Sequence, residues 1–333
     1  MRAAVCSAYG GPDALTIDVV EVPSPGPGEV RVAVDVAAVN FPDVLVLAGQ
    51  YQIKVPPPFV LGSEFAGVVS AVGDAVTEVA VGDRVFGSCL VGAFAEQVVV
   101  PASGLMPVPD GVATDVAAGF GVAHRTAYHS LRSVGRLAAG EELVVLGAGG
   151  GVGLAAVQLG ALLGATVTAV ASTPDKLAAA EACGATRLAE HRGADLRQVL
   201  KELVPGGADV VIDPVGGALS EPALRSLRRD GRFVVVGFAS GEIPRIPLNL
   251  VLLKGIEVVG FEFRGWAAAK PQELSRNDAE LLDLLAAGKV APYVGARFAF
   301  DDVAESVRHV AEGKAIGKVL LDVGQPIGCR PPR

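Results

Sequence analysis

The sequence predicts an α/β protein of two domains: a doubly wound parallel sheet and an irregular, mostly antiparallel β domain. The chain has 333 residues, which is more than one ordinary hydrophobic core accommodates. Glycine is plentiful at 42 residues and aromatic residues make up only 5%, which favours closely packed α/β layers. Val-rich segments alternate with helical patterns through the second half of the chain, as in sheets covered on both faces.

The first third of the chain is predicted to form short β segments joined by tight turns. Proline and glycine cluster at residues 23–28 and 56–58, and Gly-Asp pairs follow at 73–74 and 82–83. Between these turns, runs of β-branched residues are typical of strands. The expected β segments are residues 3–6, 30–39, 67–72, 84–86 and 97–100.

From residue 115 onward helices and strands alternate, which predicts right-handed β-α-β crossovers and a parallel sheet. The expected strands are residues 142–146, 166–171, 209–213, 232–236 and 256–261. The expected helices are residues 115–133, 154–163, 175–183, 195–203, 218–227 and 277–287.

The remainder after residue 263, ending in a β segment at 318–323, is too short to form a domain of its own. We expect it to pack back on the first domain. The predicted domains are therefore residues 1–122 together with 264–333, and residues 123–263. The ending, residues 324–333, contains three prolines and is expected to be a loose tail.

Charge and cysteine usage exclude several classes of function. The net charge of −8 and a pI near 5.1 argue against a nucleic-acid surface or a polybasic membrane anchor. The four cysteines lie far apart without CxxC pairing, as expected for reduced thiols. The first residues lack an apolar export signal, so a cytoplasmic location is expected. Residues 143–171 are apolar enough to suggest a membrane span, but a cluster of five glycines favours a strand, a turn and a helix.

Residues 143–153 read LVVLGAGGGVG and predict a dinucleotide-binding loop of the Rossmann type. The spacing is AxGxxG, formed by Ala148, Gly150 and Gly153, directly after a strand and at the start of a helix. Gly150 lets the backbone approach a pyrophosphate, and Gly153 lets helix and strand pack closely. The phosphates are expected at the helix N-terminus, where free N–H groups favour anions. The alternative is a glycine-rich turn that serves packing alone. The predicted cofactor-binding residues of this loop are Ala148, Gly149, Gly150, Gly151, Val152 and Gly153.

The end of the next strand favours NADP(H) over NAD. An NAD site carries an acidic residue there to bind the ribose 2′-OH, whereas this chain has Ala171 and Ser172, with Lys176 shortly after. A small residue, a hydroxyl and a cation suit a 2′-phosphate. Asp175 is a contrary signal, although an acidic residue also suits the first turn of a helix. Lys176 has a plain alternative as a solvated surface lysine.

With these features in this order, the whole chain resembles the medium-chain dehydrogenase/reductase superfamily, and within it the zinc-independent quinone oxidoreductase branch, relatives of zeta-crystallin. The resemblance implies a GroES-like first domain. The segments that carry it are GGPDALTI (10–17), PGPGEVRV (25–32), VNFPDVLVLAGQY (39–51), FVLGSEFAGVV (59–69), VGDRV (81–85), TAYHSL (126–131), DPVGG (213–217), GRFVVVGFASGEIP (231–244) and GKVLLDV (317–323).

The resemblance also implies that no metal is bound. Zinc alcohol dehydrogenases of the superfamily have a cysteine ligand within the segment occupied here by residues 40–43. Their Gly-His-Glu motif is replaced by Gly-Ser-Glu, with Ser63 at the histidine, and the third ligand position corresponds to Val122. Ser and Val do not hold Zn²⁺ in an N/S site. The lobe of a structural Cys₄ zinc is absent, leaving only Cys89.

Similarity to this branch implies roles for individual residues. Asn40 and Asp43 are expected to shape the pocket near the nicotinamide, with Tyr51 at its mouth. Asn40 has an alternative as the cap of a turn, and Tyr51 as a half-buried surface aromatic. The resemblance assigns to the cofactor Thr126, Ser172, Lys176, His191, Arg192, Gly237, Phe238, Ala239, the backbone around Phe261, and Lys318.

Two segments depart from the family pattern. Relatives have an Asn-Tyr-Gly-Thr type segment where this chain has His124 and Arg125 before Thr126. These residues either alter the pocket wall or bring Arg125 to the cofactor phosphates. A tyrosine near the adenosine in relatives is replaced by His191, followed by Arg192.

The expected function is NADPH-dependent reduction of quinones or α,β-unsaturated carbonyls, by transfer of hydride or of single electrons from the nicotinamide. No residue stands out as the acid, so solvent, Tyr51 or a ribose hydroxyl is the expected proton source. The alternatives are an enoyl-thioester or 2-alkenal reductase, and a non-enzymatic NADPH-binding protein with a regulatory or structural role. The expected partners are a small molecule, no nucleic acid, no membrane, and a second copy of the chain through the apolar edge strand 256–261.

Overall fold

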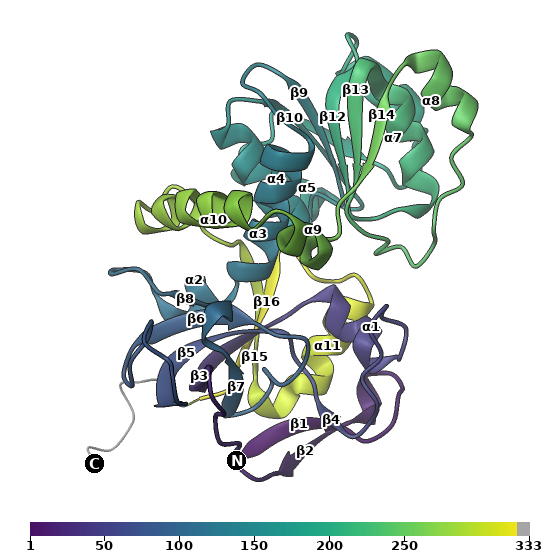
Figure 1. Ribbon diagram of the computed structural model, residues 1–333. Helices are drawn as coiled ribbons and strands as arrows, with labels where there is room; N and C mark the ends of the chain where they lie inside the picture. The colour runs from purple at the N-terminus through teal and green to yellow at the C-terminus, as the bar shows by residue number, and fades with distance from the viewer. Residues whose placement is uncertain (325–333) are drawn as a thin grey trace. The chain divides into compact units, whose positions relative to one another are not determined.

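The computed structural model describes residues 1–324, so nearly all of the expected tail at 324–333 lies outside the described residues. The chain divides into two compact units (Figure 1). Unit 1 comprises Met1–Val122 and Val294–Arg333, and unit 2 comprises Ala123–Tyr293.

Unit 1 is built on a seven-stranded, mostly antiparallel sheet and a smaller three-stranded sheet. The orders are β15-β16-β3-β5-β6-β8, with β7 also paired to β3, and β2-β1-β4. The strands are β1 (Arg2–Cys6), β2 (Leu15–Val19), β3 (Glu29–Val39), β4 (Phe59–Val60), β5 (Glu64–Val72), β6 (Arg84–Ser88), β7 (Gln97–Pro101), β8 (Leu105–Pro107), β15 (Val294–Ala299) and β16 (Lys318–Asp322). Its helices are α1 (Phe41–Leu47), α2 (Thr114–Ala118) and α11 (Val303–Ala311).

The long strand β3 organises unit 1. It is antiparallel to β5, β7 and β16, and only the β15–β16 pair of this sheet is parallel. Apolar side chains of β3, among them Val32 and Val34, join a buried core to which both ends of the chain contribute, from Ala4 to Leu321. The predicted irregular, mostly antiparallel β domain is confirmed.

Unit 2 contains a six-stranded sheet in which every pair of neighbours is parallel. The order is β11-β10-β9-β12-β13-β14, which is the 3-2-1-4-5-6 order of a Rossmann fold. The strands are β9 (Glu142–Leu146), β10 (Thr166–Ala171), β11 (Arg187–Glu190), β12 (Ala208–Asp213), β13 (Leu227–Val235) and β14 (Glu257–Gly260). The helices are α3 (Gly121–His129), α4 (Gly151–Leu162), α5 (Pro174–Ala182), α6 (Leu196–Leu203), α7 (Ser220–Ser226), α8 (Leu248–Lys254), α9 (Phe263–Ala269) and α10 (Pro271–Ala286).

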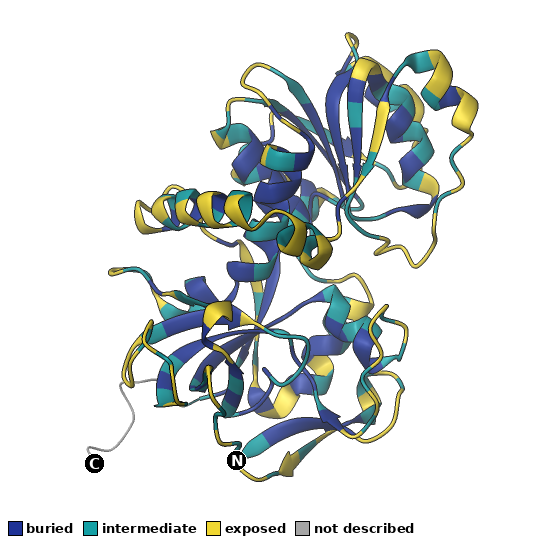
Figure 2. Ribbon diagram, viewed as in Figure 1, coloured by how far each residue is buried: buried dark blue, intermediate teal, exposed yellow. Residues whose placement is uncertain are grey.

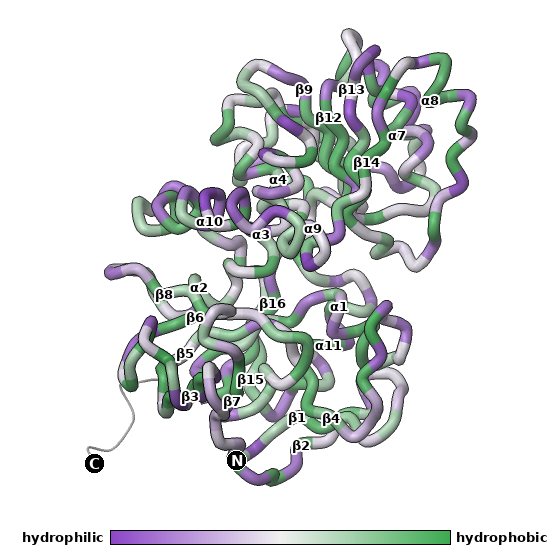
Figure 3. Tube along the Cα trace, viewed as in Figure 1, coloured by the Kyte–Doolittle hydropathy of each residue, from purple (hydrophilic) through white to green (hydrophobic). Residues whose placement is uncertain are grey.

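Helices cover this parallel sheet in pairs: α4 packs beside α5, and α6 beside α7. Figure 2 shows the central strands as buried, and Figure 3 shows the same strands as strongly hydrophobic. Strands covered on both faces explain the uninterrupted apolar runs of the sequence. The predicted doubly wound sheet is confirmed, and residues 143–171 form β9, α4 and β10. Within the described chain, every helix is too short or too polar to cross a membrane.

The segment 264–293 differs from the expectation, since it clusters with unit 2 and not with unit 1. Polar contacts of α10 explain the difference. The Asn277 amide lies 3.1 Å from His129 Nδ1 and donates to Ser133 Oγ at 2.8 Å, while Asp278 pairs with Arg125. The expected helix 115–133 is also divided, because Gly119 ends α2 and a π-helical turn follows α3.

Candidate functional site

The glycine loop after β9 leads directly into the N-terminus of α4. Gly147 has a φ of +61°, a conformation that favours glycine. A Cβ on Gly153 would lie 2.0 Å from the Gly147 carbonyl oxygen, so strand and helix approach too closely for any side chain there. Gly150 is the N-cap of α4, and no side chain of the described residues caps this end. The first N–H groups of α4 are therefore available to an anion, at the switch point between β9 and β12.

A cationic side chain lies on this loop. A Cβ added to Gly149 would lie 2.5 Å from both Cβ and Cγ of Lys176, so the aliphatic stem of Lys176 covers Gly149. Burial, and then the positive charge of Arg192, lower the pKa of Lys176. Burial and Arg192 also lower the pKa of His191. Lys176, His191 and Arg192 thus form a basic cluster beside the loop, an arrangement suited to a phosphate group.

The acidic residue in this region is turned to another task. Asp175 is exposed and lies in the first turn of α5, where a negative charge complements the helix dipole. Thr173 caps the same helix through the N–H of Lys176. Ser172, directly after β10, is half-buried. No carboxylate therefore takes the position after β10 that an NAD site requires.

A second loop at the same end of the sheet follows β12, and its rigidity comes from Asp213. The buried carboxylate accepts the N–H groups of Val215 and Gly216, each at 2.8 Å, and the Ser220 hydroxyl at 2.6 Å. The sequence analysis used this segment only for the family resemblance and gave Asp213 no role. The signal was the DPVGG turn, because an Asp before a Pro-x-Gly segment caps its own backbone.

The remaining cofactor residues predicted in unit 2 lie on α3 and after β13 and β14. Thr126 is half-buried on α3. The turn after β13 contains Gly237, Phe238 and Ala239, and its N–H groups at Gly237 and Ala239 donate to the carbonyls of residues 213 and 214. Phe261 is buried after β14, against the rings of Phe263 and Trp266.

The family departures His124 and Arg125 have protein partners within unit 2. The guanidinium of Arg125 donates to both carboxylate oxygens of Asp278, at 2.9 and 2.8 Å, and lies over the Phe263 ring. His124 is buried, with Nε2 at 3.2 Å from Gln158 Oε1. Arg125 therefore anchors α10 to α3, and its charge is already matched by a carboxylate.

Unit 1 contains a buried polar cluster at the start of three elements. Asn40 precedes α1, Glu64 begins β5 and Lys318 begins β16. The Lys318 ammonium donates to Glu64 Oε2 at 2.8 Å and to Asn40 Oδ1 at 2.5 Å. The Asn40 amide donates to Glu64 at 3.0 Å, and the backbone N–H of Val122 donates to Glu64 Oε1 at 2.6 Å. Glu64 is therefore saturated with donors, and Lys318, expected at the cofactor, is held inside unit 1.

Asp43 is the other buried carboxyl of this cluster, and its surroundings differ. It accepts the backbone N–H of Asn40 at 2.7 Å and a hydrogen bond from the Ser63 hydroxyl, but no ammonium donates to it. Burial raises the pKa of Asp43 to about 7. A carboxyl with such a pKa exchanges a proton at neutral pH, which its neighbour Glu64, paired with Lys318, is not arranged to do.

Tyr51 lies in the turn after α1 and packs, half-buried, against the apolar core of unit 1. Its backbone N–H donates to the Leu45 carbonyl at 3.1 Å. This is the placement of a half-buried aromatic with a wet hydroxyl, one of the two interpretations that the sequence allowed.

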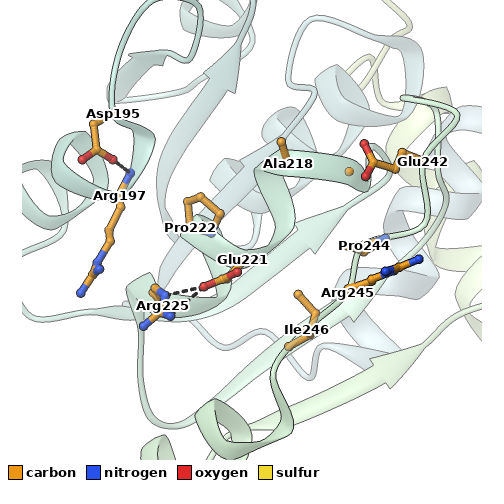
Figure 4. A pocket seen from close by; sticks show the side chains of 11 residues that line it. Asp195, Arg197, Ala218, Glu221, Pro222, Arg225, Glu242, Pro244, Arg245 and Ile246 are labelled. Carbon is orange, nitrogen blue, oxygen red and sulfur yellow. Dashed lines mark hydrogen bonds and ion pairs between the residues drawn. The ribbon is translucent and has the colours of Figure 1, made fainter.

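The largest cavity among those described in unit 2, about 630 Å³, involves none of the predicted site residues (Figure 4). It lies by the starts of α6 and α7 and the segment after β13. Its charges balance, because Arg197, Arg225 and Arg245 face Asp195, Glu221 and Glu242, and Arg225 pairs with Glu221 at 2.7 Å.

Within residues 1–324, no three His, Cys, Asp or Glu side chains gather closely enough to hold a metal ion. The cysteines of this part, Cys6, Cys89 and Cys183, are free thiols. Fold and loops together define a two-unit dehydrogenase or reductase with a Rossmann-type unit.

Comparisons with known proteins agree. Residues 26–110 match the alcohol dehydrogenase GroES-like domain, and residues 151–282 match the zinc-binding dehydrogenase family. A quinone oxidoreductase-like protein 2 homolog from Nematostella vectensis is 36% identical over 97% of this chain and 89% of its own length.

Two solved structures are also similar. The Escherichia coli quinone oxidoreductase complexed with NADPH has a TM-score of 0.89 at 28% identity, covering 97% of this chain and all (100%) of that one. A mycobacterial protein complexed with NADPH also has a TM-score of 0.89, at 31% identity, covering 96% and 99%. The chain belongs to the medium-chain dehydrogenase/reductase superfamily and is quinone oxidoreductase-like, which confirms the resemblance found in the sequence.

Proposed function

We propose that this chain is an NADPH-dependent, zinc-independent reductase of quinones or α,β-unsaturated carbonyls. The observation that carries the proposal is the contact between Lys176 and Gly149, which brings a cation onto the loop at the N-terminus of α4. An uncapped helix N-terminus suits a pyrophosphate, and an added cation beside Ser172 suits the 2′-phosphate of NADPH. The NADPH complexes of the two similar structures support this choice of cofactor.

In this proposal residues 123–263, which lie in unit 2, bind the cofactor, and NADPH when bound supplies the hydride. The pyrophosphate is held by Ala148, Gly149, Gly150, Gly151, Val152 and Gly153. The adenosine and its phosphate are held by Ser172, Lys176, His191 and Arg192. The nicotinamide is held by Thr126, Gly237, Phe238, Ala239 and the backbone at Phe261.

Unit 1 supplies the polar groups for the acceptor, among them Asn40, Asp43 and Tyr51. The residues of unit 1 do not fit the zinc ion that the family description mentions. Ser63 and Val122 offer no nitrogen or sulfur ligand, and the backbone N–H of Val122 is already donated to Glu64. The ammonium of Lys318 takes the oxygens of Glu64 and Asn40, and a second cation beside it would be repelled.

This donor set favours an acceptor that is electrophilic without help from a metal. Oxidation of an alcohol requires loss of its proton, which zinc normally assists by stabilising the alkoxide. A quinone or an enone needs only orientation and hydrogen-bond donors for the charge that develops on its oxygen. Unit 1 offers such donors in a partly buried setting, so reduction of a conjugated carbonyl is the reaction that it supports best.

The test is oxidation of NADPH by the purified protein with a panel of small quinones, 2-alkenals, enones and enoyl thioesters, and with alcohols plus NADP⁺ as the reverse assay. We expect turnover with quinones or conjugated carbonyls, and none with alcohols. Preference for enoyl thioesters would replace the substrate class. Tight NADPH binding without any reduction would favour a regulatory or structural role.

We also propose that the protein is a homodimer. β14 is the last strand of the parallel sheet and has one unpaired edge. The neighbouring helix α8 exposes Leu248, Leu252 and Leu253, at 79, 80 and 70% of their surface, beside the partly exposed Val258 of β14. An apolar edge of this kind invites pairing with a two-fold copy, which would bury both the ladder and the leucines.

A further inference from the structure

The Ser63 backbone is held in place by its neighbours in unit 1. Gly62 has a φ of +101°, and a Cβ there would lie 2.2 Å from the Phe94 ring. The carbonyls of residues 61, 62 and 63 accept backbone N–H groups at 2.8, 3.0 and 2.9 Å. Ser63 itself is half-buried, so it belongs partly to the surface, whereas Asp43 is 1% exposed. The hydroxyl of Ser63 is therefore a fixed link between a buried carboxyl and the outside of unit 1.

The charges in the cluster explain why Asp43 holds a proton. Lys318 and Glu64 form a buried pair at 2.8 Å and cancel one another. Ionised Asp43 would add an unmatched negative charge, which is costly in a buried place. These two residues are the charged groups that act on Asp43: Glu64 raises its pKa and Lys318 lowers it, while burial has the largest effect. No charged group of α11, which packs on α1, is among them.

We propose that Ser63 and Asp43 are the proton-donating pair of the reduction, with Ser63 as the catalytic residue and Asp43 acting through it. The inference rests on the proposed function and deepens it. Two carboxyls in one buried cluster have different tasks, since Glu64 is fixed by a cation whereas Asp43 faces a hydroxyl.

The step balances in atoms and charge. The acceptor gains a hydride at carbon or oxygen from the nicotinamide and then carries a negative charge on oxygen. As that oxygen takes the proton of the Ser63 hydroxyl, the Ser63 oxygen takes the proton of the Asp43 carboxyl. The products are the neutral reduced acceptor, intact Ser63 and ionised Asp43, which is protonated again from solvent before the next turnover.

Two conservative variants test the pair: Asp43→Asn, which keeps the shape of the protonated acid, and Ser63→Ala. The measurement is the pH dependence of kcat with the best acceptor of the panel, together with the Kd of NADPH. In the wild type kcat should fall as the pH rises through about 7. In both variants this limb should disappear and kcat should fall by about tenfold or more, with the Kd of NADPH unchanged.

Ser63→Thr, which restores a hydroxyl, should recover most of kcat and the pH limb. Ser70→Ala is the matched control, because Ser70 is also a half-buried serine of β5, bonded instead to Arg31 and Gln97. Infrared spectroscopy gives a readout without turnover: the band of a protonated carboxyl should be present below about pH 7, and absent above it and in Asp43→Asn.

Two results would overturn the inference in different ways. If the wild type reduces an acceptor and both variants keep its pH profile, the pair is wrong, solvent is the donor, and the proposed function stands. If the wild type binds NADPH but reduces no acceptor, the proposed function fails and the pair fails with it.

Discussion

Lys318 donates a hydrogen bond of 2.8 Å to Glu64, and both side chains are almost fully buried. The two residues are 254 positions apart in sequence and join the first residues of β16 and β5. A buried pair of this kind is costly to break, because the remaining partner keeps an unmatched charge.

Lys318→Met should therefore reduce the free energy of unfolding by about 3–5 kcal/mol. Denaturation by urea measures the loss. The double variant Lys318→Met with Glu64→Gln should lose less, since no buried charge is left alone. Lys314→Met is the control: Lys314 pairs with Glu312 on the surface, and its removal should change little. Equal losses in both lysine variants would contradict a special role for the buried pair.

Asp43→Asn should change how stability depends on pH. The folded-state pKa of Asp43 is raised from 3.8 to about 7, so between these values the folded protein binds more protons than the unfolded chain. The wild type therefore loses stability on this account as the pH rises through that interval. Asn does not titrate, so the stability of the variant relative to the wild type should increase with pH from about 4 to about 7. A constant difference across the interval would show that Asp43 has an ordinary pKa.

Lys176→Ala should weaken NADPH binding by about 1–3 kcal/mol and leave NADH binding nearly unchanged, because only NADPH carries the 2′-phosphate. Fluorescence titration with both nucleotides measures the two affinities. The exposed Lys201 of α6 serves as the matched control, and Lys201→Ala should affect neither nucleotide. Equal losses for NADPH and NADH in the Lys176 variant would remove Lys176 from the phosphate.

Two glycines of the loop after β9 should respond differently to a side chain. Nothing lies within 3.4 Å of a Cβ on Gly150, so Gly150→Val should fold, yet its side chain should block the pyrophosphate and abolish NADPH binding. Gly153→Ala should lower the melting temperature, because its Cβ would lie 2.0 Å from the Gly147 oxygen. Thermal melting and nucleotide titration of both variants separate the effects. Normal NADPH affinity in Gly150→Val would place the phosphates elsewhere.

Charges on the apolar edge of unit 2 should prevent dimer formation. We expect the wild type to be a dimer at micromolar concentration, and the double variant Leu252→Lys with Val258→Lys to be a monomer of 33.8 kDa before the substitutions. Multi-angle light scattering gives the mass. Leu162→Lys, at a partly exposed leucine of α4, should leave the dimer intact. A monomeric wild type would refute the proposed interface.

The parallel sheet was predictable because its strands are local in sequence and buried on both faces. Each of β9, β10, β12 and β13 is a Val-rich run bounded by turns, and the glycine loop follows the first of them. Right-handed crossovers then leave few possible orders, of which the one found is the most common.

The cluster around Glu64 was not predictable from local pattern, because its members come from three distant segments. Lys318 was expected at the cofactor, and only pairing of β16 with β3 brings it to Asn40 and Glu64. The short helix α1 was missed for a different reason: its start, with Asn40 and Pro42, also fits a turn. The segment 264–293 was assigned by length alone, whereas the partners of Asn277 and Asp278 on and after α3 decide its unit.

The pairing of β3 with β16 imposes an order of events on synthesis. Unit 2 is one continuous stretch, so it is complete when residue 293 has left the ribosome. Unit 1 still lacks β15, β16 and α11 at that moment, and its exposed β3 edge and unfilled core have no partner. The N-terminal strands must therefore wait for the last residues of the chain, and during this interval they are the part of the nascent protein most in need of a chaperone.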